Sequence, residues 1–162
     1  MASKTDFTPS EWAQLLKAPA WASIAVMAAS PSGPLGALKE MFAAGKVLAD
    51  AKAGASNPLV TALVNDLATS EGRHLAHPTE LAGKTPDQVQ AAATEALRQV
   101  ATLVGAKGGA DAADFKRWLA NLAERVASAS KEGGFLGIGG TRVDEKETTA
   151  LAGINKALGV AG

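Results

Sequence analysis

Apolar residues recur along the chain with the three- and four-residue spacing of one helix face, with charged residues between them. This pattern predicts seven helices. They run from Pro9 to Lys17, from Pro19 to the residue before Pro31, from Pro34 to about Lys52, from Pro58 to Ser70, from Pro86 to about Val104, from the residue after Asp111 through Val126, and from Glu145 to Leu158. No stretch alternates between apolar and polar residues for long enough to form a strand. We therefore expect an all-α bundle that forms a single domain over residues 1–162, with a flexible N-terminal segment at residues 1–7.

Residues that favour helix ends support these boundaries. Three of the predicted helices begin with a capping residue and a proline, at Thr8-Pro9, Asn57-Pro58 and Thr85-Pro86. A cap of this kind accepts a backbone N–H that the helix leaves unpaired, and proline is tolerated next because its nitrogen has no hydrogen to donate. Glu11 and Gln88 stand three residues after two of the caps and complete capping boxes. Gly159 is suited to end the last helix.

The most apolar run of the chain spans residues 18–29. A membrane span needs roughly 20 apolar residues, so we expect this run to be a buried core helix. The polar N-terminus contains Asp6 and lacks the basic-then-apolar order of a secretory signal. The sequence therefore predicts a soluble, cytoplasmic protein with no membrane span.

Composition narrows the possible functions. The 162 residues include 16 Lys and Arg, 16 Asp and Glu, two His and no Cys. The lack of cysteine excludes a disulfide framework, thiol catalysis and Cys-ligated zinc. A net charge of zero and an aromatic content of 4% are untypical of nucleic-acid binders. Hydrophobic residues make up 47% of the chain, and the abundance of alanine among them predicts closely packed helices.

Residues 131–143, with the sequence KEGGFLGIGGTRV, form a glycine-rich loop that also carries Phe135, Leu136 and Ile138. A solvent-exposed linker does not need three large apolar side chains. The loop is therefore expected either to pack onto the bundle or to present an apolar patch to a protein partner or a second copy of the chain. Arg142, beside the start of the last predicted helix, is a candidate to hold a small anion.

Two segments of the chain echo each other. Ala29-Ser30-Pro31-Ser32-Gly33 is similar to Ala129-Ser130-Lys131-Glu132-Gly133, and each segment joins two predicted amphipathic helices. This pattern suggests a bundle built from two related helical hairpins. In the second copy the helix that ends at Glu132-Gly133 is followed by an Asp-x-x-Glu cap at Asp144…Glu147, and the next helix closes with Leu158-Gly159.

This organisation resembles the TerB-like family, named for a tellurite-resistance protein and found also in membrane-associated co-chaperones. The resemblance covers approximately residues 20–48 and 115–160. It implies an all-helical fold and a divalent-cation site in the acidic turns, for which Glu132, Asp144 and Glu147 are the candidates here. A hard cation takes six or more oxygen ligands, and this chain has Ser32 where the family carries an acidic residue in the first turn. Helix capping is an alternative role for Asp144 and Glu147.

His74 and His77 stand three residues apart, with Glu71 and Glu80 nearby. Zinc accepts two histidines and a carboxylate, so these residues form a second candidate metal site. Pro78 follows directly, and the surrounding stretch is polar. The alternative is a pair of surface histidines on a connection between helices.

The sequence favours a non-enzymatic helical protein with a binding or structural role. One alternative is a divalent-metal-binding stress protein of the tellurite-resistance type. Another is a small enzyme or ligand carrier whose site lies between helices. No catalytic residue and no cofactor is predicted, apart from the possible divalent cation, and self-association is left open.

Overall fold

The computed structural model describes residues 1–29, 49, 52, 57–132 and 145–161. The described part of the chain forms six α-helices and two short 3-10 helices, with no strand. The α-helices are α1 (Pro9–Ala29), α4 (Pro58–Leu67), α5 (Ser70–Leu75), α6 (Pro86–Lys107), α7 (Ala112–Glu132) and α8 (Glu145–Leu158), and the 3-10 helices are η1 (Lys4–Asp6) and η2 (Gly109–Asp111). The prediction of an all-α bundle is confirmed.

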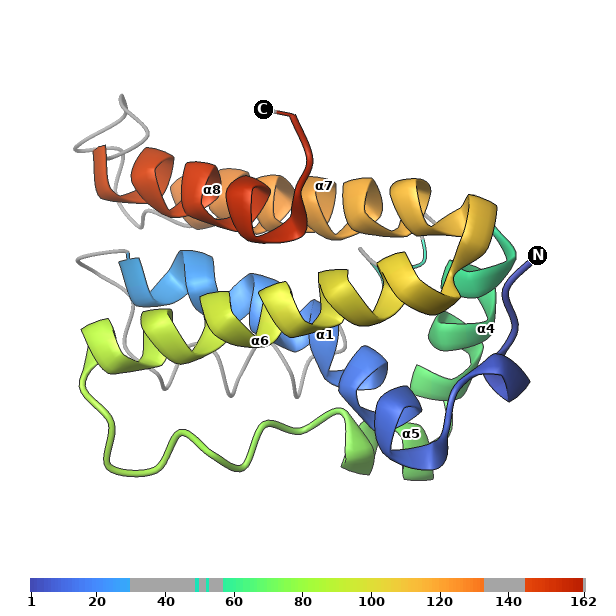
Figure 1. The fold of residues 1–162 in the computed structure, drawn as a ribbon. Helices are drawn as coiled ribbons and strands as arrows, with labels where there is room; N and C mark the ends of the chain where they lie inside the picture. Colours follow the sequence, from blue (N-terminus) through green and yellow to red (C-terminus); the bar gives the residue numbers. More distant parts are fainter. Residues whose placement is uncertain (30–48, 50–51, 53–56, 133–144, 162) are drawn as a thin grey trace.

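Helices α1, α6, α7 and α8 form the body of the bundle, and α4 and α5 lie at one end of it (Figure 1). In the view of Figure 1, α7 and α8 make an upper layer over α1 and α6. Helix α1 touches all the other α-helices of the described chain. It is therefore the central element on which the others pack.

The burial of α1 explains why its sequence is so apolar. Every residue from 18 to 26 is buried, so this part of the helix has no solvent-facing side. The single polar side chain in that stretch, Ser23, donates a hydrogen bond of 2.9 Å to the backbone carbonyl of Pro19. The prediction that residues 18–29 form a buried core helix is confirmed, with only Met27 and Ala28 partly exposed.

The prediction of two separate helices before residue 31 is wrong. Residues 9–29 form one helix that continues through Pro19. Proline inside a helix removes one backbone hydrogen bond, clashes with the preceding turn and costs about 3 kcal/mol. Burial on both sides of the proline, including Leu16 before it and Trp21 after it, offsets this cost. In Figure 1 the first turns of α1 are inclined to the later ones, as expected of a proline kink.

The connection after α4 also differs from the prediction. Helix α4 ends at Leu67, and a separate short helix, α5, follows where the sequence predicts a polar linker. The side chain of Thr69 caps α5 by accepting a hydrogen bond of 2.9 Å from the backbone N–H of Gly72. Of the predicted helix at 34–52, the structure describes Ala49 and Lys52, and both are helical.

The predicted caps are present where the structure describes them. Thr8 and Glu11 form a reciprocal capping box, as do Thr85 and Gln88. Gly159 has a φ of +69°, and Val160 donates its N–H to the carbonyl of Asn155, which closes α8 in the way that a C-terminal glycine allows. These caps hold the helix ends at the positions that the sequence indicates.

Residues 1–7, expected to form a flexible segment, pack against the bundle in the structure. Ala2 and Phe7 are buried, and the backbone N–H of Ala2 donates a hydrogen bond of 2.8 Å to Asp111 Oδ2. The Phe7 ring lies 5.9 Å from that of Trp12, centroid to centroid. The segment is therefore tied to both α1 and the η2 turn.

None of the helices within the described ranges has both the length and the apolar character needed to cross a bilayer.

Candidate ligand-binding groove

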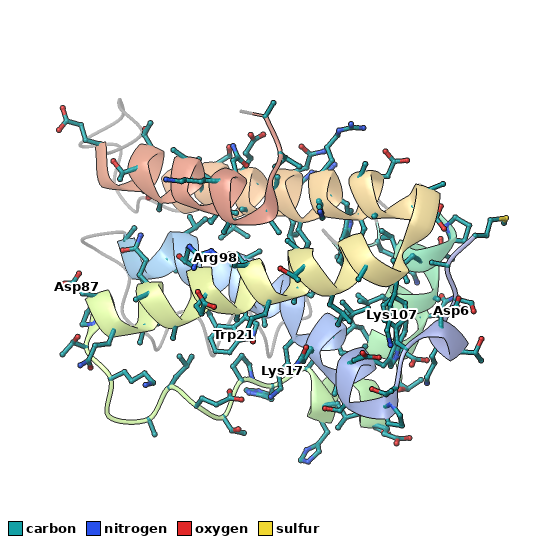
Figure 2. The ribbon with its side chains drawn as sticks, in the orientation of Figure 1. Asp6, Lys17, Trp21, Asp87, Arg98 and Lys107 are labelled. Atoms are coloured by element: carbon teal, nitrogen blue, oxygen red, sulfur yellow. The ribbon has the colours of Figure 1, made fainter. Side chains whose placement is uncertain are left out.

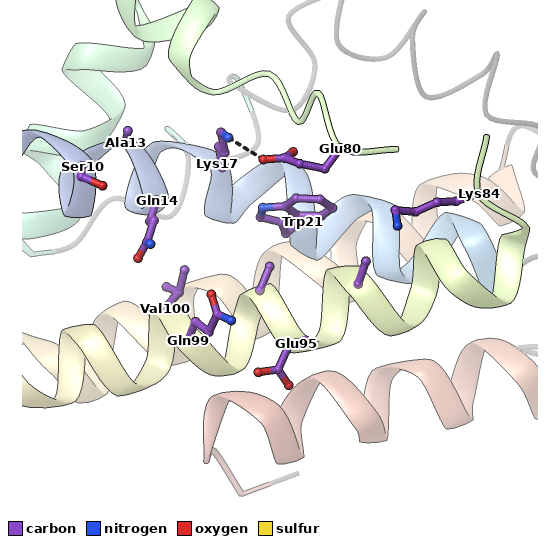
Figure 3. A pocket seen from close by; sticks show the side chains of 12 residues that line it. Ser10, Ala13, Gln14, Lys17, Trp21, Glu80, Lys84, Glu95, Gln99 and Val100 are labelled. Carbon is purple, nitrogen blue, oxygen red and sulfur yellow. Dashed lines mark hydrogen bonds and ion pairs between the residues drawn. The ribbon is translucent and has the colours of Figure 1, made fainter. Parts of the chain in front are cut away.

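A groove of about 540 Å³ lies between α1, α6 and the segment 76–85 that connects α5 to α6 (Figure 3). This volume is within the range of pockets that hold small organic ligands. The lining residues are Ser10, Ala13, Gln14, Lys17, Trp21, Glu80, Lys84, Ala92, Glu95, Ala96, Gln99 and Val100.

On each of the two helices, α1 and α6, the residues that line the groove lie on one face. Residues three or four positions apart point to the same side of a helix, and the lining residues of both α1 and α6 follow this spacing. Alanine occupies three of these positions, Ala13, Ala92 and Ala96. These small side chains leave open a volume that larger side chains at the same positions would fill.

Trp21 forms the apolar base of the groove. Only 7% of its surface is exposed, and it is the one aromatic side chain among the described lining residues. Figure 2 shows Trp21 and Lys17 projecting from α1 into the space between α6 and the connecting segment. An indole presents a broad apolar surface to a ligand at low cost in conformational entropy.

An ion pair ties α1 to the connecting segment at the rim. Lys17 Nζ donates a hydrogen bond of 3.0 Å to Glu80 Oε1, and the Lys17 side chain is 24% exposed. This hydrogen bond from Lys17 holds the pKa of Glu80 below its ordinary value of 4.5. Glu80 is therefore ionised at neutral pH, and the charges of the pair compensate each other.

The other polar side chains of the lining differ in whether they form ion pairs. Glu95 forms an ion pair with Arg98 one turn further along α6. Lys84 forms no ion pair with any residue that the structure describes, and its side chain reaches toward α1 beside Trp21 (Figure 3). Gln14 and Gln99 contribute amide groups from the two helices. The groove thus combines an apolar base with a rim of hydrogen-bonding and charged groups.

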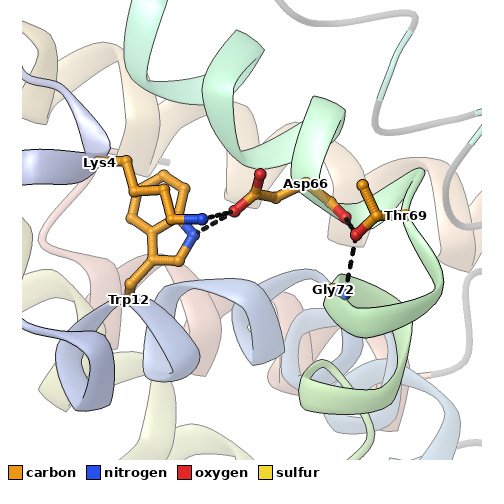
Figure 4. Close-up of polar contacts among 5 residues, drawn as sticks. All are labelled: Lys4, Trp12, Asp66, Thr69 and Gly72. Carbon is orange, nitrogen blue, oxygen red and sulfur yellow. Dashed lines mark hydrogen bonds and ion pairs between the residues drawn. The ribbon is translucent and has the colours of Figure 1, made fainter.

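A second polar cluster, centred on Asp66, joins the N-terminal segment to α4 (Figure 4). Asp66 Oδ2 accepts hydrogen bonds from Lys4 Nζ at 2.6 Å and from Trp12 Nε1 at 2.7 Å. The hydrogen bond from Lys4 is the main reason why the pKa of Asp66 lies below its ordinary value. Because each of these groups is already partnered within the protein, the cluster has a structural role.

The histidine candidates lie on the surface. His74 is in α5 and His77 follows its end, and both are exposed. Glu80 is paired with Lys17. Nowhere in the described part of the chain do three or more His, Asp or Glu side chains come together in a way that could hold a metal ion.

The candidates near the C-terminus lie mostly outside the described residues. This holds for Phe135, Leu136, Ile138, Arg142 and Asp144, and for residues 133–143 of the loop predicted at 131–143. The first two residues of that predicted loop belong instead to α7. Glu132 is the last residue of α7, and Glu147 is a buried residue of α8. Their proposed roles in cation or partner binding stay predictions.

Sequence reasoning did not identify the groove. Its walls come from three segments, and each contributes residues that look like an ordinary exposed helix face or loop. One signal was available on α1, where Lys17 stands one turn before the buried Trp21. A lysine beside a core tryptophan marks the border between the buried and exposed faces, where a groove can open.

Comparison with known proteins gives no further guide to identity. No family model matches the chain, and no curated protein or solved structure matches it.

Proposed function

We propose that the protein is a non-enzymatic binding protein whose groove between α1 and α6 accepts a small organic ligand. The observation that supports this proposal is the groove itself, which combines about 540 Å³ of open volume with an apolar base at Trp21 and a polar rim. Concave sites with this combination are the usual form of small-molecule sites in proteins.

The composition of the lining agrees with binding more than with catalysis. Gln14 and Gln99 offer hydrogen bonds without a change of protonation. Glu80 and Glu95 each form an ion pair with a basic side chain of the protein. Groups of this kind orient a ligand and select its shape.

The test uses a neutral aromatic probe, N-phenyl-1-naphthylamine, whose fluorescence rises in an apolar environment. We expect saturable binding to the purified protein with one site per chain. In Ala92→Phe a ring replaces a methyl group on the groove wall, and we expect the affinity to fall by about tenfold or more because the volume is lost.

The matched control is Ala91→Phe, which introduces the same ring at the neighbouring exposed position of α6, outside the lining. Its affinity for the probe is expected to equal that of the wild type. Thermal unfolding followed by circular dichroism shows that both variants are folded. Unsaturable binding, or equal affinity in the Ala92→Phe variant, would contradict the proposal.

A further inference from the structure

The charges around the groove separate into compensated and uncompensated groups. Glu80 is compensated by Lys17, and Glu95 by Arg98. Lys84 is the remaining charged side chain of the lining, and it has no ion-pair partner among the residues described. Although the whole chain carries a net charge of zero, the ion pairs among the described residues leave the positive charge of Lys84 uncompensated in the groove.

The positions of these side chains give the groove two different ends. Figure 3 shows Lys17, Glu80 and Lys84 around Trp21, whereas Gln14, Gln99 and Val100 lie further along the two helices. One end is therefore cationic and lies beside the apolar indole. The other end offers neutral amides and aliphatic surface.

We propose that the groove selects small organic anions, with the acidic group of the ligand at Lys84 and its apolar body along Trp21 and the alanines. This inference rests on the proposed binding function. The acidic group forms a charge-assisted hydrogen bond with the Lys84 ammonium, which is stronger than a bond between neutral groups. The apolar body occupies the volume that the three small residues of the wall leave open.

Glu80 opposes the binding of an anion. Its carboxylate stands at the same end of the groove and belongs to the connecting segment, where its side chain is 54% exposed. An arriving anion competes with Glu80 for Lys17 and is repelled by the Glu80 charge. Removal of this charge is therefore expected to strengthen the binding of anions, and removal of the Lys84 charge to weaken it.

The experiment compares two probes with the same aromatic body. 1-Anilinonaphthalene-8-sulfonate carries a sulfonate that N-phenyl-1-naphthylamine lacks. We expect the wild type to bind the sulfonate at least threefold more tightly than the neutral probe in low salt, and this preference to shrink as salt is added. In the Lys84→Gln variant the preference is expected to disappear, and in the Glu80→Gln variant to grow by about three- to fivefold.

Lys156→Gln is the matched control, because it removes the same charge from an exposed position on α8 outside the lining. It is expected to leave both affinities unchanged. Saturable binding of the neutral probe without a preference for the sulfonate overturns the anion selectivity and leaves the proposed function standing. No saturable binding of either probe overturns both. A preference that survives Lys84→Gln overturns the assignment to Lys84.

Discussion

The indole of Trp12 and the carboxylate of Asp66 are joined by a hydrogen bond of 2.7 Å across 54 residues of sequence. Trp12 is 3% exposed, so its N–H has little access to water. The same carboxylate oxygen accepts a hydrogen bond from the ammonium group of Lys4 (Figure 4). One side chain of α4 therefore fixes both the first turns of α1 and the segment that precedes them.

Replacement of Asp66 tests this relationship. Asp66→Ala leaves the indole N–H without a partner, and a buried donor left unsatisfied costs about 1–3 kcal/mol. Urea unfolding measures the loss. Asp66→Asn keeps an oxygen that can accept the indole N–H, so its loss is expected to be smaller. Equal losses in the two variants would show that the charge of Asp66, and not its hydrogen bond to Trp12, provides the stability.

The stability is expected to depend on pH in the acid range. The pKa values of Asp66 and Glu80 lie below their ordinary values of 3.8 and 4.5, chiefly because Lys4 and Lys17 donate hydrogen bonds to them. In the unfolded chain these carboxylates take up protons at higher pH than in the folded protein, so their contribution is present above the ordinary values. It is lost as the pH falls through the lower pKa values of the folded state.

Urea unfolding between pH 6 and pH 3 measures this dependence. The unfolding free energy is expected to decline below about pH 4.5, and the decline is expected to be shallower in Asp66→Asn, which lacks one of the shifted groups. If the unfolding free energy of Asp66→Asn declines as steeply with falling pH as that of the wild type, Asp66 makes no contribution to the acid sensitivity.

Gly72 is required for the close approach of α5 to the end of α4. A Cβ atom at this position would lie 1.9 Å from the backbone oxygen of Asp66. Backbone atoms cannot move aside as the end of a flexible side chain can, so Gly72→Ala is expected to cost about 3 kcal/mol or more. Thermal unfolding checks this expectation.

Gly153 is the matched control for this substitution. It lies inside α8, and an added Cβ atom there meets nothing within 4 Å. Because alanine favours the helix over glycine, Gly153→Ala is expected to stabilise the protein by up to about 1 kcal/mol. The two glycine-to-alanine changes are therefore expected to act in opposite directions, and a small effect at Gly72 would contradict the close contact.

Asn57 joins the start of α4 to the η2 turn. Its side-chain oxygen accepts the N–H of Val60 at 2.8 Å, and its side-chain nitrogen donates to the carbonyl of Asp111 at 3.2 Å. The residue is 5% exposed. Asn57→Ala is expected to cost about 2 kcal/mol, because both the cap and the bridge are lost. Asn57→Ser retains the cap alone and is expected to lose about half as much. A free energy of unfolding in Asn57→Ser equal to that of the wild type would show that the bridge to Asp111 contributes nothing.

The helix ends were predictable because they depend on neighbours in sequence. Thr85 and Gln88 stand three residues apart and form their capping box from that spacing alone. The continuation of α1 through Pro19 was not predictable in this way. It depends on burial by α6, α7 and α8, which come much later in the chain and outweigh the local preference of proline.

The groove was hidden for a related reason. Lys17 lies on α1, whereas Glu80 and Lys84 lie on the connection between α5 and α6. These two parts of the sequence show no common motif, and only the fold brings them together. Similarly, Gly72 weakens the helical pattern when read alone. The reason for a glycine here is the backbone oxygen of Asp66, which occupies the space of a Cβ atom and is brought there by the turn between α4 and α5.

Because the middle of α1 is completely buried, its folding depends on the order in which the helices of the protein are synthesised. During synthesis α1 leaves the ribosome before two of its main partners, which begin only at Pro86 and Ala112. Until α6 and α7 have been translated, the apolar surface of α1 stays uncovered by them. Residues 18–26 of the nascent chain are thus expected to promote aggregation until these helices have been made, and a chaperone that shields residues 18–26 is expected to raise the yield of folded protein.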